Sequence, residues 1–190
     1  MQATTGTPLS DEADQGPGHR DGGHRRPLGG RHLAVWACVA LVAYLLDQVT
    51  KWWAESQLTT GVPRQVVGDL LQLELTHNAG AAFSVGAGYT IALTLVAIAV
   101  IAGCLRLASR LGSIGWAVAL GLLLGGALGN VTDRLLRDPG PLRGHVVDFL
   151  RIPHWPIFNV ADASICVAAV LFVALSVRGV RFDGSRDRGR

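Results

Sequence analysis

Four long apolar stretches alternate with shorter polar segments along the 190-residue chain. Each stretch approaches the length of about 20 residues that a helix needs to cross the hydrocarbon core of a bilayer. The first is the least uniform, because it runs on into Asp47 and Lys51. We therefore predict an α-helical integral membrane protein, a bundle of four transmembrane helices at about residues 33–52, 89–107, 112–133 and 157–177.

The segment between the first two predicted helices carries a different pattern. Leu71–Thr76 alternates apolar and polar residues, which is typical of a strand with one buried face. We predict a small extracytoplasmic β element here, between helices one and two. The later segment Leu135–Pro156 contains Asp138-Pro139-Gly140-Pro141, and these turn residues predict an irregular loop.

Composition and charge agree with a membrane protein. The chain is 49% hydrophobic and only 16% charged, which is too apolar for an ordinary soluble domain. Its net charge of +3 comes from dispersed arginines, which argues against a nucleic-acid partner. Arginines gather before the first helix, between helices two and three, and after helix four, so the positive-inside rule predicts that both termini are cytoplasmic. The loop 135–156 also carries three arginines and disagrees with this assignment.

The two ends differ from the apolar core. Residues 1–31 are rich in Gly, Arg, His and Asp, and such a composition cannot bury a core. We predict a disordered cytoplasmic tail at 1–31, a membrane domain at 32–178 and a basic cytoplasmic tail at 179–190. The protein is expected to be a multi-pass membrane protein.

This topology brings the unusual polar residues to one membrane surface. They lie at or next to the outer ends of the predicted helices: Asp47, Lys51, Asn78, Asn130, Asp133, Arg134, Asp148, Asn159 and Asp162. Carboxylates at such positions are costly and are retained by partners or by function. Asp47 and Lys51 have i,i+4 spacing, and Asn159 and Asp162 have i,i+3 spacing, so each pair shares a helix face. The sequence therefore predicts one polar site at the extracytoplasmic face.

Two of these carboxylates form the best candidate for chemistry. Asp162 is held on a helix, and Asp148 lies among apolar neighbours. Two carboxylates close together in a low-dielectric site share a proton, which suits activation of water and protonation of a leaving amide. Asp133 is a rival, but Arg134 and Asn130 on the same predicted helix face indicate a structural partner set. Gly125, Gly126 and Gly129 are expected to let a neighbouring backbone approach closely.

Five motifs in order extend this interpretation: Asp47-x-x-Thr50-Lys51, Asn78-x-Gly80-Ala81-Ala82-Phe83-Ser84, Gly125-Gly126-Ala127-x-Gly129-Asn130-x-x-Asp133-Arg134, Val146-Val147-Asp148-Phe149 and Phe158-Asn159-x-Ala161-Asp162-x-x-Ile165. Over roughly 36–177 the chain resembles lipoprotein signal peptidase, also called signal peptidase II. The resemblance implies an aspartic endopeptidase that cuts diacylglyceryl-modified prolipoproteins just before the lipidated cysteine.

The resemblance also assigns roles to residues. It implies that Asp148 and Asp162 are the catalytic aspartates, in agreement with the pair chosen above. It implies supporting or substrate-binding roles for the other motif positions: Asp47, Lys51, Asn78, Gly80, Asn130, Asp133, Arg134, Asn159 and Ala161. No metal or cofactor is expected, globomycin should inhibit, and the partners are prolipoprotein substrates and membrane lipid. We expect a monomer.

Other functions fit the sequence less well. A zinc protease would carry a His-Glu-x-x-His motif, which is absent from the sequence. A serine–lysine protease would have to use Lys51, the only lysine, which has an acid beside it. A small proton-coupled transporter could use intramembrane acids, but transporter sites usually lie near the bilayer midplane. The acids here gather at one surface, which favours a hydrolase.

Overall fold

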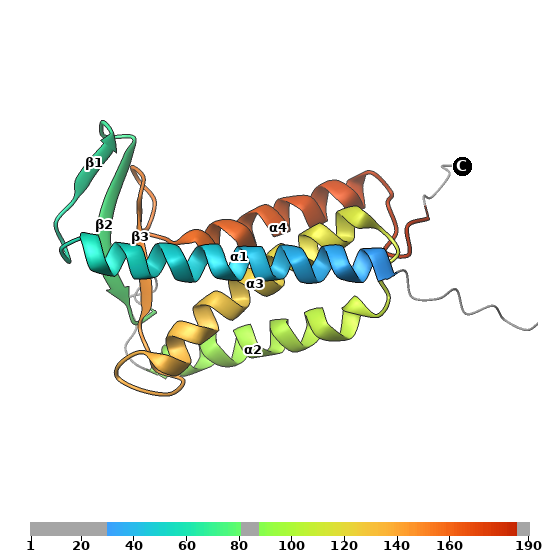
Figure 1. Cartoon of the computed structure of the whole chain (residues 1–190), viewed down its shortest axis with the longest axis horizontal. Coiled ribbons are helices and arrows are strands. Elements are labelled where there is room, and N and C mark those ends of the chain that lie inside the picture. The colour runs from blue at the N-terminus through green and yellow to red at the C-terminus, as the bar shows by residue number, and fades with distance from the viewer. Residues whose placement is uncertain (1–29, 81–87, 186–190) are drawn as a thin grey trace, which may run out of the picture.

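The computed structural model describes residues 30–80 and 88–185. Four helices and three strands follow one another in this order: α1 (Gly30–Gln57), β1 (Arg64–Val67), β2 (Leu71–Asn78), α2 (Gly88–Ala108), α3 (Ile114–Leu136), β3 (Val146–Arg151) and α4 (Val160–Val177). All four helices are long and apolar enough to cross a membrane. Figure 1 shows them side by side, with the strands at one end of the bundle. The predicted fold class, a four-helix membrane bundle with a small β element, is confirmed.

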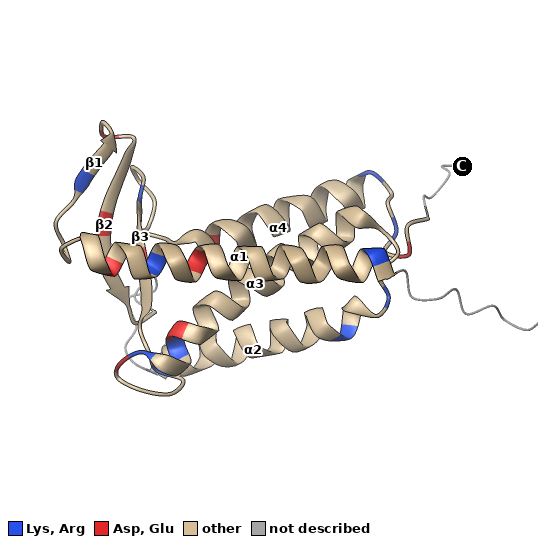
Figure 2. Cartoon of the chain, viewed as in Figure 1, with Lys and Arg blue, Asp and Glu red and all other residues tan. Residues whose placement is uncertain are grey.

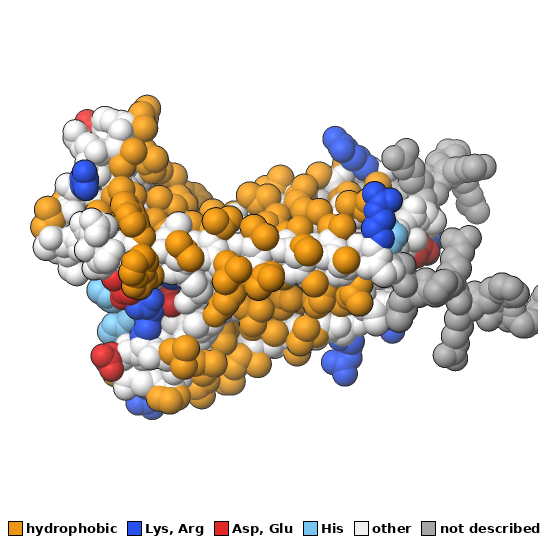
Figure 3. All heavy atoms as spheres, in the orientation of Figure 1, with side chains coloured by type: hydrophobic (Ala, Val, Ile, Leu, Met, Phe, Trp, Pro, Cys, Tyr) orange, Lys and Arg blue, Asp and Glu red, His pale blue; other side chains and the backbone are white. Residues whose placement is uncertain are grey.

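The surface of the bundle is apolar where lipid would surround it. Large hydrophobic side chains such as Leu41, Val96 and Val170 are more than half exposed. Figure 3 shows hydrophobic side chains covering this face of the helical part, with charged side chains at its two ends. Such a belt would be unstable in water, so the chain is a multi-pass membrane protein.

Helix α3 is the central helix, because it packs against each of the other three. Its glycines make this possible. A Cβ atom on Gly125 would lie 2.5 Å from the carbonyl oxygen of Ala40 in α1, and one on Gly126 would lie 2.6 Å from that of Ala161 in α4. A Cβ on Gly129 would lie 2.3 Å from Oδ2 of Asp47. The predicted close approach at these glycines is confirmed.

The sheet is larger than the sequence predicted. Its strands are antiparallel in the order β1-β2-β3, and β3 comes from the segment between α3 and α4. The prediction that Leu135–Pro156 is irregular throughout is therefore wrong. The turn residues occupy only its first half, whereas Val146–Arg151 is an apolar run that pairs with β2 and opposes Asp148 to Thr76.

The helix boundaries differ from those expected by a few residues. Helix α1 continues to Gln57, beyond the apolar stretch that predicted an end near residue 52. Helix α4 starts at Val160 instead of 157, because Asn159 caps it. The Asn159 side chain accepts a hydrogen bond from the N–H of Asp162, and the Asp162 side chain accepts one from the N–H of Asn159. This reciprocal capping box fixes the start of the helix.

The start of α1, the end of α4 and the α2–α3 connection all lie at the end of the bundle opposite the sheet (Figures 1 and 2). The segment after α4 folds back onto α3 there: Nε1 of Trp116 donates to the carbonyl of Val180 at 2.8 Å, and the Trp116 and Phe182 rings lie 5.3 Å apart. The predicted tail at 1–31, apart from Gly30 and Arg31 in α1, and residues 186–190 lie outside the described residues.

Candidate active site

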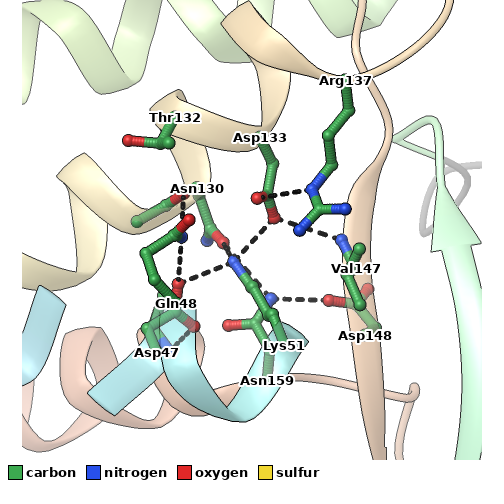
Figure 4. A network of polar contacts seen from close by, with 12 residues as sticks. Asp47, Gln48, Lys51, Asn130, Thr132, Asp133, Arg137, Val147, Asp148 and Asn159 are labelled. Atoms are coloured by element: carbon green, nitrogen blue, oxygen red, sulfur yellow. Dashed lines mark hydrogen bonds and ion pairs between the residues drawn. The ribbon is translucent and has the colours of Figure 1, made fainter. Parts of the chain in front are cut away.

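A buried ammonium group lies at the sheet end of the bundle. Lys51 is completely buried, and its Nζ lies 2.8 Å from a carboxylate oxygen of Asp47 and 2.8 Å from one of Asp133. The same Nζ donates to Oδ1 of Asn130 at 3.1 Å (Figure 4). The i,i+4 spacing on α1 explains the first contact, and the close approach of α3 provides the other two. A buried charge is tolerated because it is paired and hydrogen-bonded.

Asp133 connects this ammonium to the sheet. Its Oδ1 accepts a hydrogen bond from Nε of Arg137 at 2.8 Å, and its Oδ2 accepts one from the backbone N–H of Val147 at 3.2 Å. Arg137 also pairs with Glu55 at the end of α1. Asp133 therefore holds α1, α3 and β3 in one arrangement. Arg137 was missed from the sequence, although its i,i+4 spacing from Asp133 is a signal that could have found it.

Arg134 does not belong to this structural set. It is 8% exposed, and its Nη1 has no hydrogen-bond partner in the part of the chain that the structure describes. The expected pairing of Arg134 with Asp133 is wrong, because adjacent helical residues point about 100° apart. The charge that acts on Arg134 most strongly is that of Asp148, followed by those of Asp133 and Asp162. Arg134 is thus a buried cation on which the charges of both candidate catalytic carboxylates act.

The amide of Asn130 reaches Asp162. Its Nδ2 donates to Oδ1 of Asp162 at 2.8 Å, while its Oδ1 accepts hydrogen bonds from Lys51 and from Nδ2 of Asn159 at 3.2 Å. An ammonium group can only donate, so Lys51 requires the oxygen of this amide to face it. The nitrogen is consequently turned toward Asp162.

Asn159 joins the two candidate carboxylates. It is completely buried, and its Nδ2 donates to Oδ1 of Asp148 at 2.6 Å. Its Oδ1 accepts the backbone N–H of Asp162 at 2.9 Å, as part of the capping box. A single side chain therefore holds Asp148 of β3 beside the first turn of α4, although the two aspartates come from different elements.

Asp148 is 1% exposed and is held by a second amide. Nδ2 of Asn78 donates to its Oδ2 at 2.9 Å, and the N–H of Gly80 donates to Oδ1 of Asn78 at 2.8 Å, which sets the direction of that amide. Gly80 has φ +101°, a conformation that favours glycine. Burial raises the pKa of Asp148 to about 6, with a further contribution from the negative charge of Asp162; hydrogen bonds from Asn78 and Asn159 and the charge of Lys51 oppose this increase.

Asp47 anchors the start of α4. Its Oδ1 accepts the backbone N–H of Ala161 at 2.9 Å, and its Oδ2 accepts Nε2 of Gln48 at 3.1 Å. Gln48 also donates to the carbonyl of Gly129 at 3.3 Å, a contact for which the sequence offers no signal. Every residue named from the sequence lies in this region: Asp47, Lys51, Asn78, Gly80, Asn130, Asp133, Arg134, Asp148, Asn159, Ala161 and Asp162. Ala81–Ser84 of the second motif lie outside the described residues.

The chemistry of the site is that of carboxylates, amides and two buried cations. Within residues 30–80 and 88–185, His, Cys, Asp and Glu side chains form no group of three or more suited to hold a metal ion. Two carboxylates joined by an asparagine, one with a pKa near 6, can exchange protons with water and with a substrate near neutral pH.

Comparison with known proteins identifies the family to which the chain belongs. The model of signal peptidase II matches residues 39–178. The chain belongs to the signal peptidase II family. Relatives named lipoprotein signal peptidase include one from Mycolicibacterium smegmatis, 52% identical over 80% of this chain and 65% of the relative. Another, from Mycobacterium tuberculosis H37Rv, is 49% identical over 83% of this chain and 78% of the relative. One from Streptomyces coelicolor is 48% identical over 84% of this chain and 78% of the relative.

Solved structures share the fold. Two structures described as bacterial membrane enzymes are each 26% identical in sequence to this chain. The first has a TM-score of 0.68 and covers 76% of this chain and 94% of that one. The second has a TM-score of 0.69 and covers 83% and 93%, respectively. The family match thus covers most of the membrane bundle and all the candidate site residues.

Proposed function

We propose that this protein is an aspartic endopeptidase that removes signal peptides from diacylglyceryl-modified prolipoproteins by cutting before the lipidated cysteine. Family membership supports a peptidase that acts on signal peptides. The observation that carries the aspartic mechanism is the link through Asn159, which holds the Asp148 carboxylate against the first turn of the helix that bears Asp162.

In this mechanism the two aspartates have different roles. Asp162 lies in the first turn of α4, where the helix N-terminus stabilises a negative charge. It takes a proton from water, and the water oxygen attacks the carbonyl carbon of the scissile amide. Asp148, whose pKa is raised to about 6, donates a proton to the carbonyl oxygen. The tetrahedral diol then breaks down: the amide nitrogen receives the proton held by Asp162, the C–N bond breaks, and Asp148 recovers its proton from the diol. The products are the signal-peptide carboxylate and a new amino terminus on the lipidated cysteine.

The other motif residues support these two. Asn78, Asn130 and Asn159 direct amide N–H groups at the carboxylates and hold them in place. Arg134 carries an N–H group that lacks a partner among the described residues, so it can donate to the carbonyl oxygen of the scissile bond as charge develops there. All these groups come from one chain, so a monomer suffices.

Lys51 is unsuited to act as a general base for a serine. Its Nζ is enclosed by Asp47, Asp133 and Asn130 and is completely buried, and none of these three partners is a serine. This favours the aspartate mechanism over a serine–lysine mechanism.

We further propose that both termini are cytoplasmic and that the site faces the extracytoplasmic side. Gly30 and the end of α4 lie at the end of the bundle opposite the sheet, together with the α2–α3 connection, which contains Arg110 and follows Arg106 in the last turn of α2. The positive-inside rule then orients the bundle. A reporter fused after Val177 should respond as cytoplasmic; an external response would reverse the orientation.

The test of the proposed function is a cleavage assay with purified protein. A diacylated precursor peptide in lipid bicelles should be cut just before its modified cysteine, and globomycin should block the reaction. The matched control is the same peptide without the diacylglyceryl group, which should remain intact. Cleavage at another bond, or equal cleavage of both peptides, would contradict the proposal.

A further inference from the structure

An apolar groove lies between α2 and α4, with α3 as its floor. It contains a cavity of about 350 Å³, walled by Gly103 and Cys104 of α2, Leu120 and Trp116 of α3, and Phe172 of α4. The cavity lies toward the end of the bundle where the rings of Phe182 and Trp116 are in contact, far along α3 from the candidate catalytic aspartates. None of these wall residues takes part in the polar network of the site.

The groove and the catalytic site share one face of α3. Residues at intervals of four, three, four and seven form a single stripe along α3. The stripe consists of Trp116, Leu120, Leu123, Ala127 and Arg134. Trp116, Leu120 and Leu123 line the cavity. Arg134, on which the charge of Asp148 acts more strongly than those of Asp133 and Asp162, lies at the other end of the stripe. The cavity and the candidate active site therefore lie along the same face of α3.

On α4, the flank that carries Phe172 also carries Asp162 of the candidate active site. One flank of α4 carries residues at intervals of three, four and three: Asp162, Ile165, Ala169 and Phe172. A second apolar cavity, between α1 and α4, is lined by Val160 and Ser164, which lie about 160° around α4 from Asp162. Phe172, which lines the cavity between α2 and α4, therefore lies on the flank of α4 that carries Asp162, whereas Val160 and Ser164 of the second cavity lie on the opposite side.

We propose that this cavity binds side chains from the apolar core of the substrate's signal peptide, and so acts as a subsite of the peptidase. This inference rests on the function proposed above. The distances agree: Leu120 and Arg134 are 14 residues apart on α3, or about 21 Å along the helix. The apolar core of a signal peptide has roughly 7–15 residues.

The same distance predicts which substrate residues enter the cavity. If the precursor is helical up to the cleaved bond, the contact falls about 14 residues before it. If the last three residues are extended at about 3.3 Å each, the contact falls about 10 residues before the bond. The subsite therefore selects apolar side chains about 10–14 residues upstream of the lipidated cysteine.

Filling the groove tests the subsite without touching the polar network. A Cβ atom on Gly103 would meet nothing within 4 Å, so Gly103→Trp can project a ring into the groove without moving the backbone. The matched control is Leu105→Trp, on the same helix at a side chain that is 54% exposed and does not line the cavity. Two diacylated substrates are compared, one with the complete signal peptide and one that starts a few residues before the cysteine.

Gly103→Trp should raise the apparent KM for the complete precursor about tenfold or more, because apolar side chains lose their burial site. The short peptide should be cut at the wild-type rate, and Leu105→Trp should change neither reaction. Wild-type cleavage of the complete precursor by Gly103→Trp, or an equal loss with both substrates, would overturn the subsite. Failure of the wild-type protein to cut either peptide would instead overturn the proposed function.

Cross-linking decides the location of the signal peptide even without cleavage. It uses an Asp148→Asn chain in which Cys38, Cys104 and Cys166 are replaced by alanine. Gly103→Cys reports on this groove, and Ser164→Cys reports on the cavity between α1 and α4. Precursor peptides carry one free cysteine at successive upstream positions, and copper phenanthroline is the oxidant.

Gly103→Cys should form a disulfide with cysteines about 10–14 residues before the cleavage site and with few others. Ser164→Cys should form none. Preferential cross-linking to Ser164→Cys, or cross-linking at Gly103→Cys without dependence on position, would overturn the inference.

Discussion

Two pairs of aspartates lie side by side at the sheet end of this bundle, and their surroundings differ. Asp47 and Asp133 both contact the ammonium of Lys51 at 2.8 Å, and Asp133 also pairs with Arg137. Asp148 and Asp162 contact amide groups of asparagines instead. Arg134, on which the charges of Asp148 and Asp162 both act, forms no ion pair within 4.0 Å in the described part of the chain.

This difference in surroundings suggests different roles for the two pairs of aspartates. In the first pair each carboxylate contacts a cation, and the ion pair between Lys51 and Asp133 holds helices α1 and α3 together. In the second pair amide groups take the place of ion pairs, and burial raises the pKa of Asp148 to about 6. The Lys51 group serves the second pair indirectly, because it turns the amide of Asn130 toward Asp162. We infer that the same residue type takes a structural role in the first pair and the proposed catalytic role in the second, according to its counter-charges.

Removing either of the proposed catalytic carboxylates gives the largest expected effect. Asp148→Asn and Asp162→Asn should each lower the cleavage rate by about 10²–10⁴-fold or more, because a general acid or base is lost. The lipidated precursor should accumulate, and the variant should still insert and be recovered at normal yield. Cleavage of the diacylated peptide at the wild-type rate by either purified variant would remove that residue from the dyad.

Removing the structural cation should act on stability. Lys51→Met leaves two buried carboxylates without their shared partner, at a cost of about 3–5 kcal/mol in the free energy of unfolding. Thermal denaturation in detergent should show a large decrease, with little folded protein recovered. If Lys51→Met keeps the wild-type denaturation temperature, the Lys51 group is not the structural centre of the site.

The pH dependence of stability distinguishes the two regions further. The pKa of Asp148 is raised from 3.8 to about 6, so the folded protein binds this proton more tightly than the unfolded chain does. Ionising Asp148 therefore lowers the free energy of unfolding. This loss is absent below about pH 4, grows as the pH rises through 6, and reaches about 3 kcal/mol above that.

Asp148→Asn removes this cost. We compare the denaturation temperature of the variant with that of the wild type at each pH. The variant's value minus the wild-type value should become more positive from pH 4 to pH 8, whatever it is at pH 4. A difference that stays constant over this range would contradict the raised pKa.

The smallest expected effect on stability comes from the surface ion pair between Glu55 and Arg137. Glu55 is about one-third exposed and pairs with Arg137 at the surface. Glu55→Gln should cost less than about 1 kcal/mol, because solvent screens exposed ion pairs and Arg137 keeps Asp133. A loss as large as that of Lys51→Met, measured by thermal denaturation, would extend the structural centre to the surface.

The parts that sequence could predict are those encoded by local spacing. Apolar length predicted the four helices, i,i+4 spacing predicted the Asp47–Lys51 pair, and the glycines of α3 predicted its close contacts. The pairing of Asp148 with Asp162 followed from their surroundings and from the motifs, and the structure joins them through Asn159.

The parts that failed depend on distant partners or on direction around a helix. Strand β3 exists because β2 lies beside it, and the Asn78–Asp148 contact spans 70 residues of sequence. Arg134 and Asp133 are neighbours in sequence but face different partners, which a motif alone does not reveal. The orientation of the Asn130 amide depends on Lys51 in another helix.

The most direct measurement makes the same substitution in both regions. Asp133→Asn and Asp148→Asn are purified in detergent, and each is measured for thermal stability and for the cleavage rate per folded molecule on the diacylated precursor. The account predicts that Asp133→Asn is less stable than wild type yet cleaves within about tenfold of its rate, whereas Asp148→Asn is well folded and inactive. An inactive Asp133→Asn of wild-type stability, together with an active Asp148→Asn, would contradict it.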